Sequence, residues 1–526
     1  MTTYNPWEKM SSMLYKSTQE AKDGTLIPVF SDGKTMFSRY APLKEVENFG
    51  SHIQLEGEFG GFFVVAGLGN GIHIQSLRKR FPKSKILIVE KSLDEIQWLK
   101  DKFDLSNLLS LDTVWLTDAA QAPQTFIQIY NPLLHGNFFF LPVRSWFDQM
   151  PEEGANLKVS LEQAVASIAA DYSTQAHFGK LWFRNFFLNL KSLVENPPHC
   201  QLEIKKNTAF VAAAGPSLES FIPDLKNPDI REKIYLIATD TALPTLLRQD
   251  ITPEMTVTID GQAASTRHFL QNIPSSMVLA ADISCSPDVV LRCKKNDCPI
   301  LFFRNKNPLP LLFTNYLEGQ HINSYPLLEI DTGSGTVTSA AVDIAYRIGF
   351  SQIRVGGADF AYLQGKPYCR GTYFEDQFCN NSHRTDPTEQ KYVALQYRSK
   401  TIKQGEKIVT PVLDEYRKSF FEYIQKHGEV TIITDNKTIN LPQNCVNKNS
   451  NYSIFNIKIP SISKKNYDDF VTWYKNLLEK KDNFVISSIL PLFSWYIKKN
   501  NDKCDIFHIM KLAYSLTVRY TEPYGK

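Results

Sequence analysis

The sequence of 526 residues lacks any apolar run that approaches the roughly 20 residues needed to cross a membrane. Its first seven residues, MTTYNPW, have neither the basic start nor the apolar core of a signal peptide. None of the eight cysteines forms a Cys-x-x-Cys pair, so their spacing does not favour a zinc site and is typical of reduced thiols. These absences predict a cytoplasmic protein without a membrane span.

The sequence also has no large excess of positive or negative residues. The 58 lysines and arginines stand against 55 aspartates and glutamates, and the net charge of +3 is too small to indicate a nucleic-acid partner. A hydrophobic share of 43% with 21% charged residues is sufficient for ordinary cores. We find no internal repeat and no low-complexity tract. At roughly 150 residues per domain, the length predicts about three domains.

Shifts in composition suggest where these domains lie. Residues 156–192 are apolar at helical spacing and predict a pair of linking helices, which the prolines of the Asn-Pro-Pro segment at 196–198 follow. Beyond about residue 440 the chain becomes rich in Lys, Asn, Tyr and Ile around helical patterns. We predict an α/β protein with three parts: an N-terminal Rossmann-like domain (1–195), a central Rossmann-like catalytic domain (196–440) and a C-terminal helical module (441–526).

A glycine-rich turn marks the N-terminal part. Residues 61–77 predict a strand, a turn with Gly67, Gly69 and Gly71, and a helix, and the next predicted strand ends at Glu90. This spacing is typical of a fold that binds a dinucleotide or S-adenosylmethionine, with the acid on the ribose. No catalytic set follows Glu90, so a structural Rossmann domain is favoured over a second active enzyme.

The most informative segment is residues 210–218, FVAAAGPSL, an apolar run that ends in Gly-Pro-Ser. Gly215 and Pro216 allow a sharp turn, and Ser217 would open a helix whose free N–H groups attract an anion. Taken alone, this segment is as compatible with a plain turn as with a phosphate cradle.

Two further apolar runs, at 235–240 and 255–260, end in Asp240 and Asp260. Because ligands of open α/β sheets bind outside the carboxyl ends of the strands, both acids should face the same crevice as Gly215. Residues 331–349 then predict a second anion-binding turn, with Gly333, and a helix that stops at Gly349. A strand at 352–356 follows, and Asp359 comes after its glycine turn.

In this order the motifs resemble the motility-associated factor (Maf) family of flagellin glycosyltransferases. The central domain of that family is similar to bacterial sialyltransferases and to archaeal hydroxymethylpterin diphosphokinases. The matching segments are residues 213–218, 239–244, 258–260, 333–341 and 356–360. The resemblance implies transfer of a nonulosonic acid, of the pseudaminic or legionaminic type, from a CMP-activated donor to Ser or Thr hydroxyls of flagellin, in support of filament assembly and motility.

The resemblance also implies roles for individual residues. Those that match the nucleotide-sugar contacts are Gly215, Pro216, Ser217, Asp240, Asp260, Gly333, Ser334, Gly335 and Thr336. Asp359 matches the aspartate that follows the next strand. Several relatives carry a histidine in the loop after that aspartate, and this chain does not.

Identification of a general base is therefore open, with Asp359, Tyr368 and His383 as catalytic candidates and Arg370 and Tyr373 beside them. Such a donor leaves from a tertiary carbon, so an oxocarbenium-like transition state needs stabilised phosphate charge and a proton acceptor. No cofactor and no metal is required.

Two other functions and the quaternary structure stay open. A pterin-type diphosphokinase would use the same Gly-Pro-Ser turn but need ATP and magnesium. A non-catalytic assembly factor would only bind flagellin. A homo-oligomer is compatible with the sequence.

Overall fold

The computed structural model describes residues 13–55, 60–196, 201–321, 327–333, 335–405, 407–427, 431–433, 455–500 and 504–522. The chain divides into two compact units, Met1–Gln175 and Ala176–Lys526. The division falls inside helix α8 (Pro151–Val194), whereas the boundary that we predict at residue 195 lies just beyond the end of this helix.

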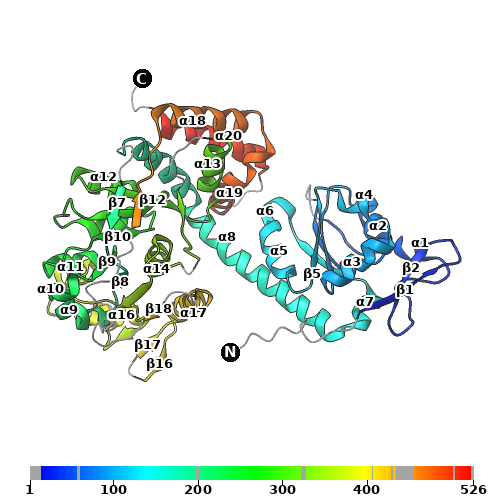
Figure 1. Ribbon diagram of the computed structural model, residues 1–526, viewed down its shortest axis with the longest axis horizontal. Helices are drawn as coiled ribbons and strands as arrows, with labels where there is room; N and C mark the ends of the chain where they lie inside the picture. The colour runs from blue at the N-terminus through cyan, green and yellow to red at the C-terminus, as the bar shows by residue number, and fades with distance from the viewer. Residues whose placement is uncertain are drawn as a thin grey trace. The chain divides into compact units, whose positions relative to one another are not determined.

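The pair of linking helices predicted over residues 156–192 is wrong, because α8 is one helix of 44 residues (Figure 1). Pro151 occupies its first position, where a missing N–H costs nothing, and no later proline interrupts the helical hydrogen bonds. Its interior glycines, Gly154 and Gly179, weaken a helix without breaking it.

The first unit contains a four-stranded parallel sheet in the order β5-β4-β3-β6, the order of half a Rossmann fold. Strand β3 is buried at every position, as expected for a parallel strand covered on both faces. The strands are β1 (Tyr15–Glu20), β2 (Leu26–Phe30), β3 (Phe62–Ala66), β4 (Lys85–Glu90), β5 (Val114–Asp118) and β6 (Phe138–Pro142), with β1 and β2 forming an antiparallel hairpin. The helices besides α8 are α1 (Pro42–Val46), α2 (Ile72–Arg80), α3 (Leu93–Lys102), α4 (Ser106–Leu109), α5 (Ala122–Ile129), α6 (Pro132–His135) and α7 (Arg144–Gln149).

The second unit is built on an eight-stranded parallel sheet in the order β13-β12-β11-β10-β9-β8-β14-β18. Its strands are β8 (Thr208–Ala212), β9 (Ile234–Thr239), β10 (Met255–Thr258), β11 (Val278–Asp282), β12 (Ile300–Arg304), β13 (Leu328–Glu329), β14 (Gln352–Gly356) and β18 (Thr431–Ile433). The strand order changes direction between β8 and β14. In doubly wound sheets such a switch point opens the ligand crevice at the carboxyl ends of the two strands.

Two small antiparallel sheets accompany this large one. They are formed by β15 (Tyr362–Leu363), β16 (Ile402–Gln404) and β17 (Lys407–Val409), and by β7 (Gln201–Ile204) with β19 (Phe455–Lys458). The helices of the second unit are η1 (Pro216–Phe221), α9 (Ile222–Lys226), α10 (Pro228–Arg231), α11 (Leu243–Arg248), η2 (Ala263–Phe269), α12 (Pro287–Lys295), α13 (Pro308–Gly319), α14 (Val337–Ile348), α15 (Tyr373–Asn380), α16 (Thr388–Gln396), α17 (Pro411–Lys426), α18 (Lys464–Glu479), η4 (Asn483–Val485), α19 (Ile486–Asn500) and α20 (Ile506–Thr521).

Helices cover both faces of the large sheet, and alternate strand residues face opposite layers. Val211 of β8 packs with residues of α14 and α17, whereas its neighbour Ala212 packs with η1 and α11. The helix predicted to stop at Gly349 is confirmed as α14, whose C-cap glycine has a φ of 105°. The predicted α/β fold class, with a helical C-terminal region, is thus confirmed.

The C-terminal helices pack against the remainder of the second unit through aromatic side chains. Phe470 of α18 lies 4.9 Å from Phe313 of α13 and 6.4 Å from Phe186 of α8, measured between ring centroids. In Figure 1 these C-terminal helices are drawn at the red end of the colour scale, and α19 contacts α13 as well. The aromatic stripe of α8 therefore contributes to a core here.

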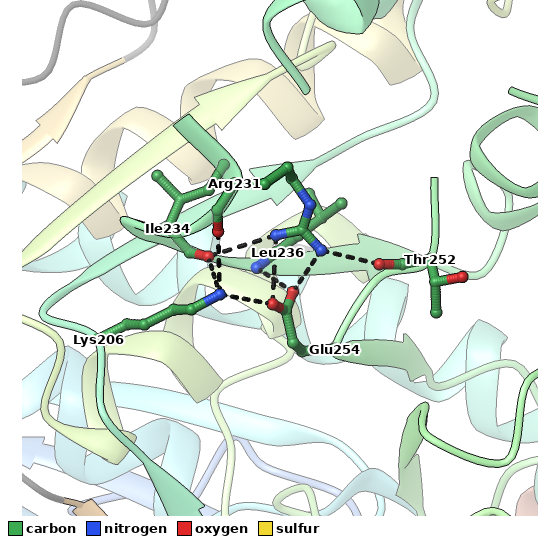
Figure 2. A network of polar contacts seen from close by, with 6 residues as sticks. All are labelled: Lys206, Arg231, Ile234, Leu236, Thr252 and Glu254. Carbon is green, nitrogen blue, oxygen red and sulfur yellow. Dashed lines mark hydrogen bonds and ion pairs between the residues drawn. The ribbon is translucent and has the colours of Figure 1, made fainter. Parts of the chain in front are cut away.

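At the amino ends of β9 and β10, a carboxylate ties three segments together (Figure 2). Glu254 accepts hydrogen bonds from Lys206 Nζ at 2.7 Å, from Arg231 Nη2 at 2.9 Å and from the Leu236 N–H at 2.9 Å. Lys206 Nζ also donates to the Ile234 carbonyl at 2.7 Å. Both cationic side chains are about four-fifths buried, so they depend on this carboxylate.

Glu254→Ala is expected to lower the free energy of unfolding of the second unit by about 2 kcal/mol, because it leaves two largely buried cations and one strand N–H without their acceptor. Thermal unfolding of purified variants measures this loss. Glu203→Ala, which removes a pair with Lys205 that is more than half exposed on both sides, is the control and should cost less than about 0.5 kcal/mol. Equal losses in the two variants would contradict the structural role of the network.

Candidate functional site

The loops that follow β8 and β14 touch backbone to backbone at the switch point. The N–H of Ala213 donates to the Gly356 carbonyl, and the N–H of Gly215 donates to the Gly357 carbonyl, both at 2.8 Å. A Cβ atom on Gly215 would lie 2.3 Å from the Gly357 oxygen, and one on Gly357 would lie 2.2 Å from the Ala213 oxygen. Glycine is therefore required at both positions by close approach.

Ser217 and Asp359 meet across this contact. The Asp359 Oδ2 atom accepts the Ser217 N–H at 2.8 Å, at the start of the short 3₁₀ helix η1. The sequence predicts that this N–H binds a phosphate. In the structure it donates instead to a carboxylate of the chain itself. The Ser217 Oγ atom is buried without a hydrogen-bond partner, so it is a polar group still free to meet a ligand.

Three neighbouring strands end in aspartates. Asp240 after β9 is buried and accepts from the Thr241 N–H at 2.7 Å and from Thr258 Oγ1 at 2.9 Å. Asp260 follows β10 and accepts from the Gln262 N–H at 2.8 Å. Burial raises the pKa of Asp260, and the charge of the nearby Asp240 raises it further. The two predicted acids therefore lie together on the carboxyl edge of the sheet.

The third aspartate, Asp282 at the end of β11, is absent from the sequence-based site. Its carboxyl is fully buried, with Oδ1 accepting the Ser284 N–H at 2.7 Å and Oδ2 without a partner. Burial raises its pKa to about 7. The signal was available, because VLAAD at 278–282 repeats the pattern of an apolar run that ends in aspartate.

Helix α8 holds the loops after β10 and β11 through two buried asparagines one helical turn apart. The Asn185 amide donates to the carbonyls of Gly261 at 2.8 Å and Ser284 at 3.2 Å. Asn189 donates to those of Ile283 and Cys285, both at 2.9 Å. The two amides thus provide hydrogen-bond donors for loop carbonyls that would otherwise be buried without one. Helix α8 therefore fixes the loops at the carboxyl edge of the sheet.

The loop after Asp359 contacts the loop after β8 and helix α11. The Cys369 N–H donates to the Ala214 carbonyl at 2.9 Å, and Thr245 Oγ1 of α11 donates to the Arg370 carbonyl at 2.8 Å. These bonds place Tyr368 with its ring stacked on Phe374, at 4.8 Å between centroids. Arg370 itself has an exposed side chain.

The Tyr368 phenol lies close to the strand-end acids. Burial raises its pKa, and the neighbouring Tyr362 hydroxyl and the Asp240 carboxylate raise it further. Tyr416 of α17 has the same effect on Tyr368. The structure therefore brings this predicted residue to the carboxyl edge of the sheet.

The second predicted anion-binding turn lies directly before α14. Ser334 lies outside the described residues. Gly333 donates its N–H to Asp331 at 2.8 Å, and Gly335 has a φ of 71°. Thr336 is the N-cap of α14 and accepts the Ser339 N–H at 3.2 Å.

Tyr416 lies near both this turn and Tyr368. A Cβ atom on Gly335 would lie 3.4 Å from its ring, and its hydroxyl is near enough to Tyr368 to affect the pKa of that phenol. The turn and Tyr368 therefore border the same region.

His383 has only local contacts. It is exposed, and it pairs with Asp386 through a short β-bridge. Its Nδ1 atom lies 3.1 Å from Thr385 Oγ1. No hydrogen bond among the described residues connects it to the strand-end acids.

A different histidine, which no sequence pattern marks, lies in η2, the segment that follows Asp260. His268 in η2 is 9% exposed, and its positive charge when protonated favours ionisation of Asp260. Its ring packs 6.0 Å from Tyr373 and 5.9 Å from Phe374. Because Phe374 also packs on Tyr373 and stacks on Tyr368, these three aromatic rings form a continuous surface beside His268.

In the first unit, protein side chains occupy the glycine turn. Glu90 accepts hydrogen bonds from the N–H groups of Leu68 and Lys91, both at 2.9 Å, from Trp146 Nε1 at 2.7 Å and from the Tyr15 hydroxyl at 3.1 Å. The acid expected on a ribose thus has its oxygens committed to the protein, and burial raises its pKa. This geometry favours a structural role for the N-terminal Rossmann-like domain over a role in binding a cofactor.

Side chains also pack directly against the glycines of this turn. A Cβ atom on Gly69 would lie 2.5 Å from the Met36 sulfur, and one on Gly67 would lie 3.0 Å from the Trp146 ring. Glycine here makes room for the protein's own core.

Across the residues that the structure describes, no group of three or more His, Cys, Asp and Glu side chains is arranged to hold a metal ion. In the same residues, no helix combines the length and the apolar character that a membrane crossing requires. Cys285, Cys293, Cys298 and Cys369 are buried free thiols, and Cys379 is an exposed one.

Comparison with known proteins connects this fold to two descriptions. Residues 184–365 match the family described as "6-hydroxymethylpterin diphosphokinase MptE-like". Among solved structures, a Maf glycosyltransferase from Magnetospirillum magneticum AMB-1 aligns over 98% of this chain and 92% of its own, with a TM-score of 0.51 at 12% identity. At that identity the likeness concerns the fold. The two matches together confirm the resemblance to the Maf family and its MptE-like central domain.

Two curated relatives come from Treponema pallidum (strain Nichols), and both are described as uncharacterized proteins. One is 27% identical over 258 residues, which are 48% of this chain and 80% of the relative. The other is 35% identical over 144 residues, which are 27% of this chain and 68% of the relative.

Proposed function

We propose that this chain, which belongs to the same protein family as the 35% identical Treponema pallidum protein, is a glycosyltransferase. It transfers a nonulosonic acid of the pseudaminic or legionaminic type from a CMP-activated donor to Ser or Thr hydroxyls of flagellin. The observation that supports this most is the fold shared with the Maf glycosyltransferase over 98% of the chain, with polar residues gathered at its switch point. The reaction takes place in the cytoplasm, on flagellin before filament assembly.

The chemistry of such a donor fits the charges at this edge of the sheet. The bond from the tertiary anomeric carbon to the phosphate breaks early, so positive charge develops on the sugar. Carboxylates held in place at Asp240 and Asp260 stabilise that charge without reorganisation. The Ser217 hydroxyl, buried without a partner, is the group in the Gly-Pro-Ser turn that contacts the nucleotide.

A pterin-type diphosphokinase is the second candidate, and the match of residues 184–365 to the MptE-like family favours it. This enzyme would bind ATP with magnesium and would not need CMP. Calorimetric titration of the full chain with CMP, and separately with ATP and magnesium, distinguishes the two. Binding of neither ligand would favour an assembly factor that only binds flagellin.

The direct test is the intact mass of flagellin from the source cell with and without this gene. We expect the mass to fall in steps of one nine-carbon sugar residue when the gene is deleted, and to recover when the wild-type gene is restored. A mass that does not change on deletion would remove flagellin as the acceptor.

A further inference from the structure

His268 combines burial with an unused ring nitrogen. Its side chain is 91% buried, since only 9% is exposed, and its Nδ1 atom has no hydrogen-bond partner. Buried polar atoms of folded proteins are nearly always paired, so an unpaired one in the segment that follows the carboxyl end of β10 indicates a position for a substrate group. The Nδ1 atom of His73, also buried and unpartnered, belongs to the first unit.

The His268 ring packs against aromatic side chains. Tyr373 and Phe374 of α15 lie 6.0 and 5.9 Å from it between ring centroids, and η2, which carries the histidine, follows Asp260 in the chain. The Arg267 guanidinium lies 5.1 Å from the Tyr373 ring centroid and donates to the Tyr373 hydroxyl.

The neighbouring helices hold this arrangement in place. Arg292 of α12 donates to the carbonyls of Phe269 and, at 2.7 Å, Leu270 directly after His268. Arg248 of α11 forms an ion pair with Asp376 of α15. The element that carries the histidine and the helix that carries its aromatic neighbours are thus both anchored by ionic or charge-assisted bonds.

We propose that His268 is the general base of the transfer reaction. The proposal rests on the proposed glycosyltransferase function. The acceptor hydroxyl gives its proton to a ring nitrogen of His268 while its oxygen forms a bond to the anomeric carbon of the donor. The bond from that carbon to the phosphate breaks, and its electron pair leaves with CMP. The imidazolium then returns the proton to solvent.

The rings of Tyr368, Tyr373 and Phe374 give this acceptor subsite an apolar wall. Such a surface suits the aliphatic part of a Ser- or Thr-containing peptide or the apolar face of a sugar ring, and it excludes water that would compete as the nucleophile. His268 fills the role of general base that neither the exposed His383 nor the hydrogen-bonded Asp359 fits as well.

The test compares His268→Gln, His268→Ala and a control, His177→Gln, at an exposed position of α8. Transfer to recombinant flagellin from CMP-pseudaminic and CMP-legionaminic acid is measured together with CMP binding. We expect CMP binding to persist in both His268 variants, kcat to fall about 100-fold or more, and the control to match the wild type. Added imidazole should restore part of the rate in His268→Ala, a rescue that a purely structural side chain would not permit.

The split between binding and rate separates catalysis from packing. A purely structural role of His268 would lower the melting temperature and leave kcat of the folded fraction unchanged, whereas loss of the base lowers kcat and leaves CMP binding intact. A His268→Gln variant that keeps more than a third of the wild-type kcat would overturn the proposal. If the wild-type protein itself neither binds CMP nor transfers a sugar, the failure belongs to the proposed function.

Discussion

Gly357→Ala is expected to lower the melting temperature of the second unit by on the order of 10 °C and to abolish CMP binding. The new Cβ atom would lie 2.2 Å from the Ala213 oxygen and 3.0 Å from the Leu218 Cβ atom, and neither neighbour is the end of a flexible side chain. The φ of 79° adds the strain of a left-handed conformation for an L-residue. Overpacking and strain together predict a loss of at least about 3 kcal/mol.

The contact cannot relax cheaply, because the Gly357 carbonyl accepts the Gly215 N–H at 2.8 Å and so joins β14 to β8. Any shift that relieves the clash also moves Ser217 and Asp359. Gly405→Ala is the matched control, with a φ of 63° and no atom within 4 Å of its new Cβ. It should cost about 1 kcal/mol from the backbone alone. If the Gly357→Ala protein has the same melting temperature as the control and binds CMP normally, the loop contact is dispensable.

Asp282→Asn is expected to remove a large pH dependence from the stability of the second unit. Burial raises the pKa of this carboxyl from 3.8 to about 7. Below pH 3.8 it is protonated in the folded and the unfolded chain alike. Between pH 3.8 and 7 the unfolded chain loses the proton and the folded chain keeps it, so the contribution to stability declines as pH rises through this window.

The expected size of the effect follows from the same shift. In the wild type, about 2 kcal/mol of stability should be lost between pH 5 and pH 8 through this group, and the asparagine variant should not lose it. Melting temperatures of both proteins across this range measure the difference. Asp288→Asn, at an exposed position of α12, is the control and should run parallel to the wild type. Parallel curves for Asp282→Asn as well would show that the buried carboxyl does not titrate in this range.

Much of the second unit could be predicted from local patterns. Short runs rich in apolar residues become the buried strands β8, β9 and β10, because a parallel strand covered on both faces needs a largely apolar sequence. Thr336 and Gly349 are found at the two ends of α14 for reasons of capping chemistry alone. Asp240 and Asp260 follow their strands, so their place on the carboxyl edge needed no knowledge of pairing beyond the parallel direction.

Local sequence patterns could not predict which distant residue each polar group would contact. The Ser217 N–H finds a carboxylate 142 positions later in the chain, at Asp359, and only the pairing of β8 with β14 brings the two together. His268 could not be identified from the sequence, because a single histidine belongs to no periodic pattern and no motif. Its importance arises from helix α15, which carries Tyr373 and Phe374 to it from more than 100 residues away.

The sequence by itself determined the strands, the caps, the Gly-Pro-Ser turn and the family resemblance, because these depend on neighbours in the chain and on the chemistry of single residues. The tertiary structure decided that α8 is one helix, that Glu90 serves its own core and that the Ser217 N–H already has an acceptor. It also decided which histidine packs against the aromatic rings of α15. Long-range pairing and burial determine these outcomes, and no local pattern encodes which distant group will arrive to meet a given donor.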